Sequence, residues 1–342
     1  MSTLHIPFRH DHVGSFLRPA RLKDARIRYE AGSISAEQLK QIEDEEIAAL
    51  IEKQKQAGCL VITDGEFRRS YWHLDFMWGF QGIQKIELDH GYFFHGEETT
   101  PGSIEVIGKI SGEDHPFVEH FRFVKQFEEE GIVAKQTIPA PAQLLAELYR
   151  EDNGEKTKKI YPDDEQLIQD IAAAYRTVIR ALYAAGCRNL QLDDCTWGLL
   201  VDEGYWATRS KEGADREKLE ATYLKLNNAA LADLPADLTV TTHVCRGNYH
   251  STWAAKGGYG PVADYLLAKE DVAAFYLEYD SERAGGFEPL AKVPADKYVV
   301  LGLLTSKSGE LEDRQTILDR IHEAAQYHDL DKLCLSPQCG FS

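Results

Sequence analysis

The chain has 342 residues, 43% of them hydrophobic and 27% charged, a balance typical of a globular protein and not of a disordered one. The formal net charge of −18 would repel nucleic-acid phosphates and anionic lipid, so neither nucleic acid nor a membrane surface is an expected partner. No stretch approaches the roughly 20 apolar residues of a membrane span or resembles a signal peptide, and six sparse cysteines predict reduced thiols. These features indicate a cytoplasmic protein, and they make no prediction of its oligomeric state.

Short runs of apolar and β-branched residues recur along the chain, and each predicts a buried parallel strand. In chain order they cover residues 12–16, 59–64, 133–139, 188–193, 238–244, 274–280, 298–305 and 332–336. Helical periodicity fills many of the intervals, at 35–58, 163–186, about 214–232, 261–269 and 312–327. The first of these helices begins with Ser35 and has Gln38 three residues later, which is the pattern of a capping box.

The alternation of these strands and helices predicts an α/β fold, a single (β/α)8 TIM barrel that spans residues 1–342. Residues 80–112 alternate in polarity instead and predict a β-hairpin insertion. In a TIM barrel the C-terminal ends of the strands carry the active site. Acidic, histidine and cysteine residues at the predicted ends would share that rim, namely Asp64, Glu66, Asp193, Asp194, His243, Cys245, Glu278, Asp280 and Cys339. So many like charges require a compensating cation.

The segment "THVCRGN" suggests which side chains hold that cation. His243 and Cys245 are two residues apart, so both face the same side if the strand extends that far. Together with Glu278 and Cys339 they would supply an imidazole, a carboxylate and two thiolates, a set that favours zinc over magnesium or calcium. Because the four residues form no local motif, packed thiols and a hydrogen-bonded histidine remain an open alternative at this point.

These segments resemble the cobalamin-independent methionine synthase family, in particular its C-terminal catalytic barrel and its short single-barrel members. "THVCRGN" is similar to the family's HxC zinc pair, "LEYDSERAG" to the strand with the ligand glutamate, and "LSPQCGFS" to the terminal NPDCG element. The resemblance implies zinc on His243, Cys245, Glu278 and Cys339. "HVGSF", "DGEF" and "QLDD" are similar to the segments that hold homocysteine, which implies that its amino acid part is bound by Ser15, Glu66 and Asp193.

The resemblance implies a homocysteine S-methyltransferase, similar to the 5-methyltetrahydropteroyltriglutamate-dependent enzyme, that forms methionine on a zinc-activated thiolate. The methyl donor stays open between 5-methyltetrahydrofolate with few glutamates, a corrinoid carried on a protein, and another methylated compound, because "TIPAPAQLL" replaces the family's TGPVT element. The sequence does not identify a catalytic acid. The family's DIHSPR histidine has no counterpart, and Lys307 stands nearest, with His12 as the other candidate.

Other functions remain open from sequence. A different zinc-dependent thiol alkylation, such as epoxide opening by a thiol cofactor, would use the same metal, although Glu66 and Asp193 suit an ammonium better than a sulfonate. The chain could also be a non-catalytic protein that binds zinc or a thiol. The loop "EFRRSYWHLDFMW" has two interpretations: it either folds over the barrel rim or contacts the methyl donor.

Overall fold

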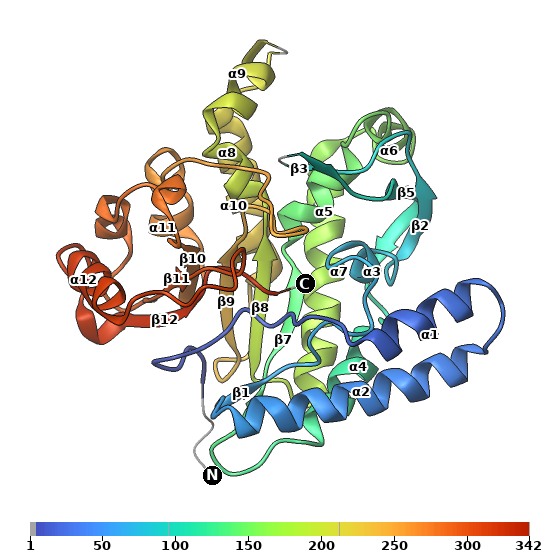
Figure 1. Ribbon diagram of the computed structural model, residues 1–342. Coiled ribbons are helices and arrows are strands. Elements are labelled where there is room, and N and C mark those ends of the chain that lie inside the picture. Colours follow the sequence, from blue (N-terminus) through green and yellow to red (C-terminus); the bar gives the residue numbers. More distant parts are fainter. Residues whose placement is uncertain (1–4, 95, 212, 342) are drawn as a thin grey trace.

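The computed structural model describes residues 5–94, 96–211 and 213–341, and its centre is a parallel sheet (Figure 1). Six strands lie in the order β12-β11-β10-β9-β8-β7, and β1 pairs separately with β6. Only Lys135 separates β6 from β7, so the predicted strand 133–139 is one interrupted strand. The bounds are β1 Val61–Ile62, β6 Val133–Ala134, β7 Gln136–Pro139, β8 Asn189–Asp194, β9 Thr239–Val244, β10 Ala274–Glu278, β11 Tyr298–Leu304 and β12 Leu333–Pro337.

The predicted strand at 12–16 is wrong as a regular strand. The N-terminal segment makes only isolated parallel bridges, from His10 to Leu335 on β12 and from Ser15 to Gly65 just after β1. Gly14 interrupts the extended backbone with a φ of +137°, and its carbonyl accepts a hydrogen bond from Thr63 instead of a ladder partner. Because the segment touches both ends of the sheet, it closes the barrel as its eighth, irregular member.

Most of the predicted helices are confirmed. Helix α2 (Ala36–Gln56) has the predicted capping box, in which Ser35 and Gln38 each accept from the other's backbone amide. Helices α7 (Asp164–Ala184), α10 (Arg216–Leu231) and α12 (Arg314–Ala324) match their predicted ranges closely. The predicted helix at 261–269 is instead two short helical elements, η1 (Gly260–Val262) and α11 (Leu266–Lys269), with residues 263–265 between them.

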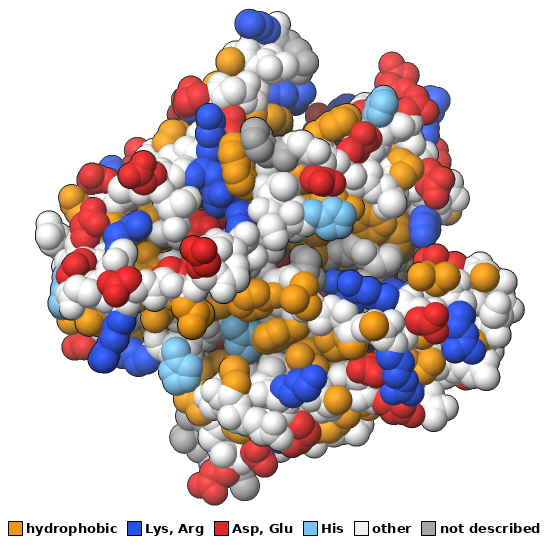
Figure 2. All heavy atoms as spheres, viewed as in Figure 1, with side chains coloured by type: hydrophobic (Ala, Val, Ile, Leu, Met, Phe, Trp, Pro, Cys, Tyr) orange, Lys and Arg blue, Asp and Glu red, His pale blue; other side chains and the backbone are white. Residues whose placement is uncertain are grey.

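Several shorter helices were not predicted from the sequence. They are α1 (Ala20–Glu30), α3 (Leu74–Met77), α4 (Phe117–Lys125), α5 (Pro141–Leu148), α6 (Asn153–Ile160), α8 (Thr196–Leu200), α9 (Glu203–Lys211), η2 (Glu282–Ala284), η3 (Glu288–Lys292) and η4 (Leu330–Lys332). Within the described part of the chain, no helix combines the length and apolar character needed to cross a bilayer. On the face shown in Figure 2, acidic and basic side chains are interspersed.

The predicted hairpin insertion is confirmed. Strand β2 (Gln81–Glu87) pairs antiparallel with β5 (Gly102–Ser111), and a smaller ribbon of β3 (Phe93–Phe94) and β4 (Glu97–Glu98) lies between them in the chain. Strand β5 contacts α3, α5 and α6, so the insertion stands beside the barrel above α3, on the right of Figure 1. Its aromatic residues are thereby brought to the rim of the barrel.

Buried Glu270 makes the stability of the fold pH-dependent. The side-chain amide of Asn227 donates to the carboxyl group of Glu270 and to that of Asp194, each at 3.0 Å. Burial, reinforced by the Asp194 charge, raises the pKa of Glu270 from 4.5 to about 8. Between these two pH values the folded protein keeps a proton that the unfolded chain has released, so the free energy of unfolding falls as the pH rises.

We therefore expect Glu270→Gln to unfold at higher urea concentrations than the wild type at pH 9. Glutamine keeps an acceptor for Asn227 and carries no charge to desolvate. The gain should be a few kcal/mol and at most about 5 kcal/mol, since a pKa raised from 4.5 to about 8 costs ~1.4 kcal/mol for each pH unit between the two values, and it should vanish near pH 5. An equal difference between variant and wild type at both pH values would contradict this assignment.

Candidate metal and substrate site

The four predicted metal ligands converge at one end of the barrel. His243 lies on β9, Cys245 directly follows it, Glu278 ends β10 and Cys339 follows β12. One ligand atom from each lies within 4.8 Å of all the others. The sulfur atoms of Cys245 and Cys339 are 3.5 Å apart. Parallel neighbouring strands end at the same rim, which explains how residues distant in sequence meet there.

The hydrogen bonds around the cluster leave the histidine ready to bind a cation. The Nδ1 atom of His243 is 3.2 Å from the carbonyl oxygen of Tyr276, so Nδ1 carries the hydrogen and Nε2 a free lone pair. Nε2 is buried on the Cys245 side of the ring, and apart from that sulfur it has no hydrogen-bond partner among the described residues. Glu278 accepts from the backbone amide of Arg246 at 2.8 Å, which orients its carboxylate. An unpaired nitrogen beside two sulfurs and a carboxylate fits zinc.

The electrostatics of the cluster also favour a cation. Hydrogen bonds from the thiols of Cys195 and Cys339 lower the pKa of Cys245 well below the usual range. The hydrogen bond to Cys245, then burial and the Cys245 charge, in turn raises the pKa of Cys339 well above its usual value. Burial, followed by the Cys245 charge, raises the pKa of Glu278 to about 7. The groups therefore compete for a single negative charge, and a divalent cation would let all of them ionise together.

Cys195 is a member of this environment that the sequence analysis missed. It follows β8 and precedes α8, and its thiol hydrogen-bonds to Cys245. It is not part of the group of four converging ligand atoms. Its position in "LDDCTW", two residues after the predicted strand 188–193, was the available signal.

A cavity of about 430 Å³ adjoins the cluster and contains the predicted substrate residues as well. His243, Cys245 and Cys339 line it on one side. Ser15, Glu66 and Asp193 line it too, so the structure brings the two predicted sets together in one space. Its size suits a small-molecule ligand.

Two carboxyl groups in this cavity are held by buried partners. Glu66, at a φ of +61°, pairs with the guanidinium of Arg69 at 3.1 Å. Burial raises the pKa of Glu66, against the opposing effect of Arg69. Burial likewise raises the pKa of Asp193 to about 7. Paired carboxyls at such a site are suited to an ammonium group, whose charge would restore their ionised forms.

Asp193 is oriented from inside the barrel. The side-chain oxygen of Gln191 accepts from the ammonium of Lys135 at 3.0 Å, so its amide nitrogen must point the other way. That nitrogen donates to Asp193 at 2.7 Å. The hydroxyl group of Ser15 lies against Gly340. A β-carbon at position 340 would be 1.7 Å from the Ser15 hydroxyl oxygen, so only glycine fits there. Arg18 also lines the cavity, and its cation suits a carboxylate.

The two candidate acids lie outside this cavity. Lys307 contacts the side-chain oxygen of Asn248 at 3.1 Å and the carbonyl of Gly247 at 3.4 Å, so it fixes the loop after β9. His12 is buried beside Lys135, and desolvation lowers its pKa to about 4. Neither side chain is among the described residues that line the cavity.

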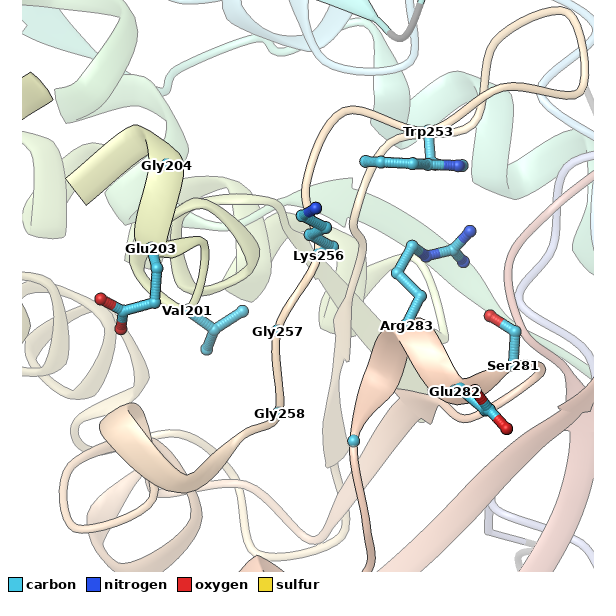
Figure 3. A pocket seen from close by; sticks show the side chains of 11 residues that line it. Val201, Glu203, Gly204, Trp253, Lys256, Gly257, Gly258, Ser281, Glu282 and Arg283 are labelled. Carbon is cyan, nitrogen blue, oxygen red and sulfur yellow. The ribbon is translucent and has the colours of Figure 1, made fainter. Parts of the chain in front are cut away.

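A second hollow lies beside Arg283 and the loop after β10 (Figure 3). It encloses about 540 Å³, and its wall includes Trp253, Lys256 and Arg283. Arg283 also reaches Glu278 at 3.4 Å and Asp280 at 3.2 Å, so it separates this hollow from the metal cluster. The predicted ligand and substrate residues all line or adjoin the first cavity, which is therefore the candidate site.

Comparison with known proteins agrees with this geometry. The family model described as "Cobalamin-independent synthase, Catalytic domain" matches residues 8–342. The uncharacterized protein YxjH of Bacillus subtilis (strain 168) is 47% identical over 98% of this chain and 88% of its own. Methionine synthase of Saccharolobus solfataricus is 25% identical over 96% of this chain and 86% of its own.

Among solved structures, one from Listeria monocytogenes, assigned as a vitamin-B12 independent methionine synthase, superposes with a TM-score of 0.79. It is 40% identical, and the match covers 99% of this chain and 93% of that one. The TIM-barrel fold expected from the sequence is thereby confirmed. The chain belongs to the family of cobalamin-independent methionine synthase catalytic domains.

Proposed function

We propose that the protein is a zinc-dependent methyltransferase that moves a methyl group to the sulfur of homocysteine and forms methionine. The observation that supports this most strongly is the common cavity. It joins a sulfur-rich ligand cluster to two carboxyl groups placed for an amino acid. Family membership supports the same reaction class.

Each site residue has a separate role in this proposal. His243, Cys245, Glu278 and Cys339 would hold the zinc ion, which would lower the pKa of the substrate thiol. Glu66 and Asp193 would bind the ammonium group of homocysteine. Ser15 would bind its carboxylate. Buried Arg69 and Gln191 hold these carboxyls in place, so the substrate sulfur would be directed toward the metal cluster.

The test is a zinc determination on the purified chain followed by transfer assays with homocysteine. We expect one zinc per chain and methionine formation with at least one of 5-methyltetrahydrofolate and methylcobalamin. A parallel assay supplies a sulfonate thiol with an epoxide. If turnover occurs only in that assay, the protein catalyses the other thiol alkylation and the proposal is wrong. If the protein holds zinc but shows no turnover in either assay, it is a non-catalytic zinc-binding protein.

We expect Glu66→Gln to raise the KM for homocysteine by about 10- to 100-fold, because it removes one charge-assisted hydrogen bond to the ammonium. Zinc content should stay at the wild-type value, since Glu66 is not a ligand in this arrangement. An unchanged KM for homocysteine would place the amino acid elsewhere in the cavity.

We also propose that residues 1–342 act as a single catalytic domain in the cytoplasm. The described N-terminal segment supplies both the barrel closure and Ser15. The six cysteines are all free thiols, as a reducing compartment would maintain them.

A further inference from the structure

A buried chain of hydrogen bonds ends at the wall of the cavity that adjoins the metal cluster. The Tyr92 hydroxyl donates to Glu147, and the Nε2 atom of His73 lies 2.7 Å from the same hydroxyl oxygen. Glu147 is 2% exposed and also accepts from Ser103. His73, which is 3% exposed, and Tyr92 both line the cavity.

This chain fixes which nitrogen of His73 carries the hydrogen. Tyrosine has a single hydroxyl hydrogen, and Glu147 accepts it, so the hydroxyl oxygen must accept from Nε2. Burial and the Glu147 charge raise the pKa of Tyr92 well above its usual value, which keeps that hydrogen in place. Burial, then Arg150, lowers the pKa of His73 to about 3, so the ring is neutral. Nδ1 is therefore a lone-pair acceptor.

That acceptor has no protein partner. Nδ1 of His73 is buried and makes no hydrogen bond among the described residues. Leaving a buried acceptor unpaired costs free energy, and because His73 belongs to the cavity lining, this unpaired nitrogen points to a ligand. The fixed surroundings strengthen the case. Arg150 stacks on the Tyr92 ring at 3.8 Å and donates to the carbonyls of His90 and Gly91, which holds Tyr92 in place.

Aromatic side chains pack against His73 and line the same cavity. The Trp72 ring lies 4.5 Å from that of His73, and the Phe94 and Tyr249 rings are 5.4 Å apart on the same cavity lining. Such rings favour stacking with a flat ligand group. The cavity volume of about 430 Å³ restricts that ligand to a small molecule.

We infer that His73 is a specificity-determining residue for the methyl donor, whose flat, uncharged group offers an N–H or O–H to the Nδ1 atom of His73. Tyr92 and Glu147 are positioning residues that hold His73 in the accepting form. The inference rests on the proposed function, because homocysteine occupies the part of the cavity next to the metal cluster. It also assigns a role to the second barrel loop, for which the sequence left two interpretations.

The first test is nitrogen NMR of the zinc-bound protein labelled with ¹⁵N-histidine, in which His73 is assigned by comparison with His73→Phe. We expect Nδ1 to resonate downfield, as a ring nitrogen without hydrogen does. Nε2 should resonate upfield, as a ring nitrogen with hydrogen does. Tyr92→Phe should convert this signal to a mixture of both forms, since the acceptor for Nε2 is gone. A mixture in the wild type, or hydrogen on Nδ1, would overturn the inference.

The second test is steady-state kinetics with whichever of 5-methyltetrahydrofolate and methylcobalamin supports transfer. His73→Phe should raise the KM for the donor roughly tenfold and leave the KM for homocysteine within about twofold, the loss expected for one hydrogen bond. His73→Asn, which returns an acceptor near the Nδ1 position, should recover part of that loss. His115→Phe is the control. His115 is also a buried imidazole, 2% exposed and hydrogen-bonded to the Phe76 carbonyl, but it does not line the cavity. Its replacement should leave the donor KM unchanged.

The outcomes separate the inference from the proposed function. If the wild type methylates homocysteine but His73→Phe keeps the wild-type KM for the donor, the inference alone is overturned. An equal rise for donor and homocysteine, or the same rise in His115→Phe, would show a general packing effect and also overturn it. If no donor methylates homocysteine, the proposed function fails, and the inference fails with it.

Discussion

Replacing Cys339 with serine is expected to abolish both zinc binding and methyl transfer. The change removes one of the two thiolates that select zinc and leaves a hydroxyl that does not ionise at neutral pH. The zinc content of the purified variant should fall from about one per chain to near zero in the presence of a weak competing chelator. Methionine formation should become undetectable. The first quantity is measured by metal analysis and the second by product formation with the active donor.

Cys195→Ser provides the matched control, because Cys195 lies in the same cavity and hydrogen-bonds to Cys245 but is outside the group of four converging ligand atoms. We expect it to retain about one zinc per chain. Loss of zinc in Cys195→Ser with retention in Cys339→Ser would assign the second sulfur ligand to Cys195 in place of Cys339. Full zinc content in both variants would exclude Cys339 as a required ligand.

The sequence was sufficient to predict the barrel and the place of the cluster because both follow from strand order. Parallel strands end at one rim, so chemically active residues after several strands must meet there. His243 and Cys245 follow from the two-residue period of a strand, and Cys339 from its place after the last strand. The irregularity of the first predicted strand, residues 12–16, could not be predicted in this way. Its apolar run is that of a strand, and only the contacts around Gly14 reveal the interruption.

The residues around the donor side of the cavity were not predicted for a different reason. His73, Tyr92 and Glu147 lie in a loop, an insertion and a helix, and no strand period relates them. The insertion itself was predictable from its alternation, but the side of the barrel on which it stands depends on contacts with α5 and α6. Hydrogen-bond direction adds information that composition does not contain, since it fixes which atom is left to accept from a ligand.

Arg69→Met is the second change with a large expected effect, and it should destabilise the protein by about 3–5 kcal/mol. Arg69 is 1% exposed and donates to Glu66 at 3.1 Å, to the Trp72 carbonyl at 3.0 Å and to both oxygens of Thr137. Methionine fills much of the same volume but leaves the Glu66 carboxylate without its cation. Urea unfolding of variant and wild type measures the difference.

A double variant identifies the origin of that loss. Arg69→Met combined with Glu66→Gln should recover part of the stability, because the amide no longer buries an uncompensated charge, whereas homocysteine binding should stay impaired. Lys225→Met is the control for an exposed ion pair, since the 2.6 Å contact with Glu165 is solvent-accessible and should contribute below about 1 kcal/mol. If the double variant is no more stable than Arg69→Met, the guanidinium acts through the backbone carbonyls that it holds and not through Glu66. The fold at the second barrel loop would then depend on Arg69 independently of the substrate site.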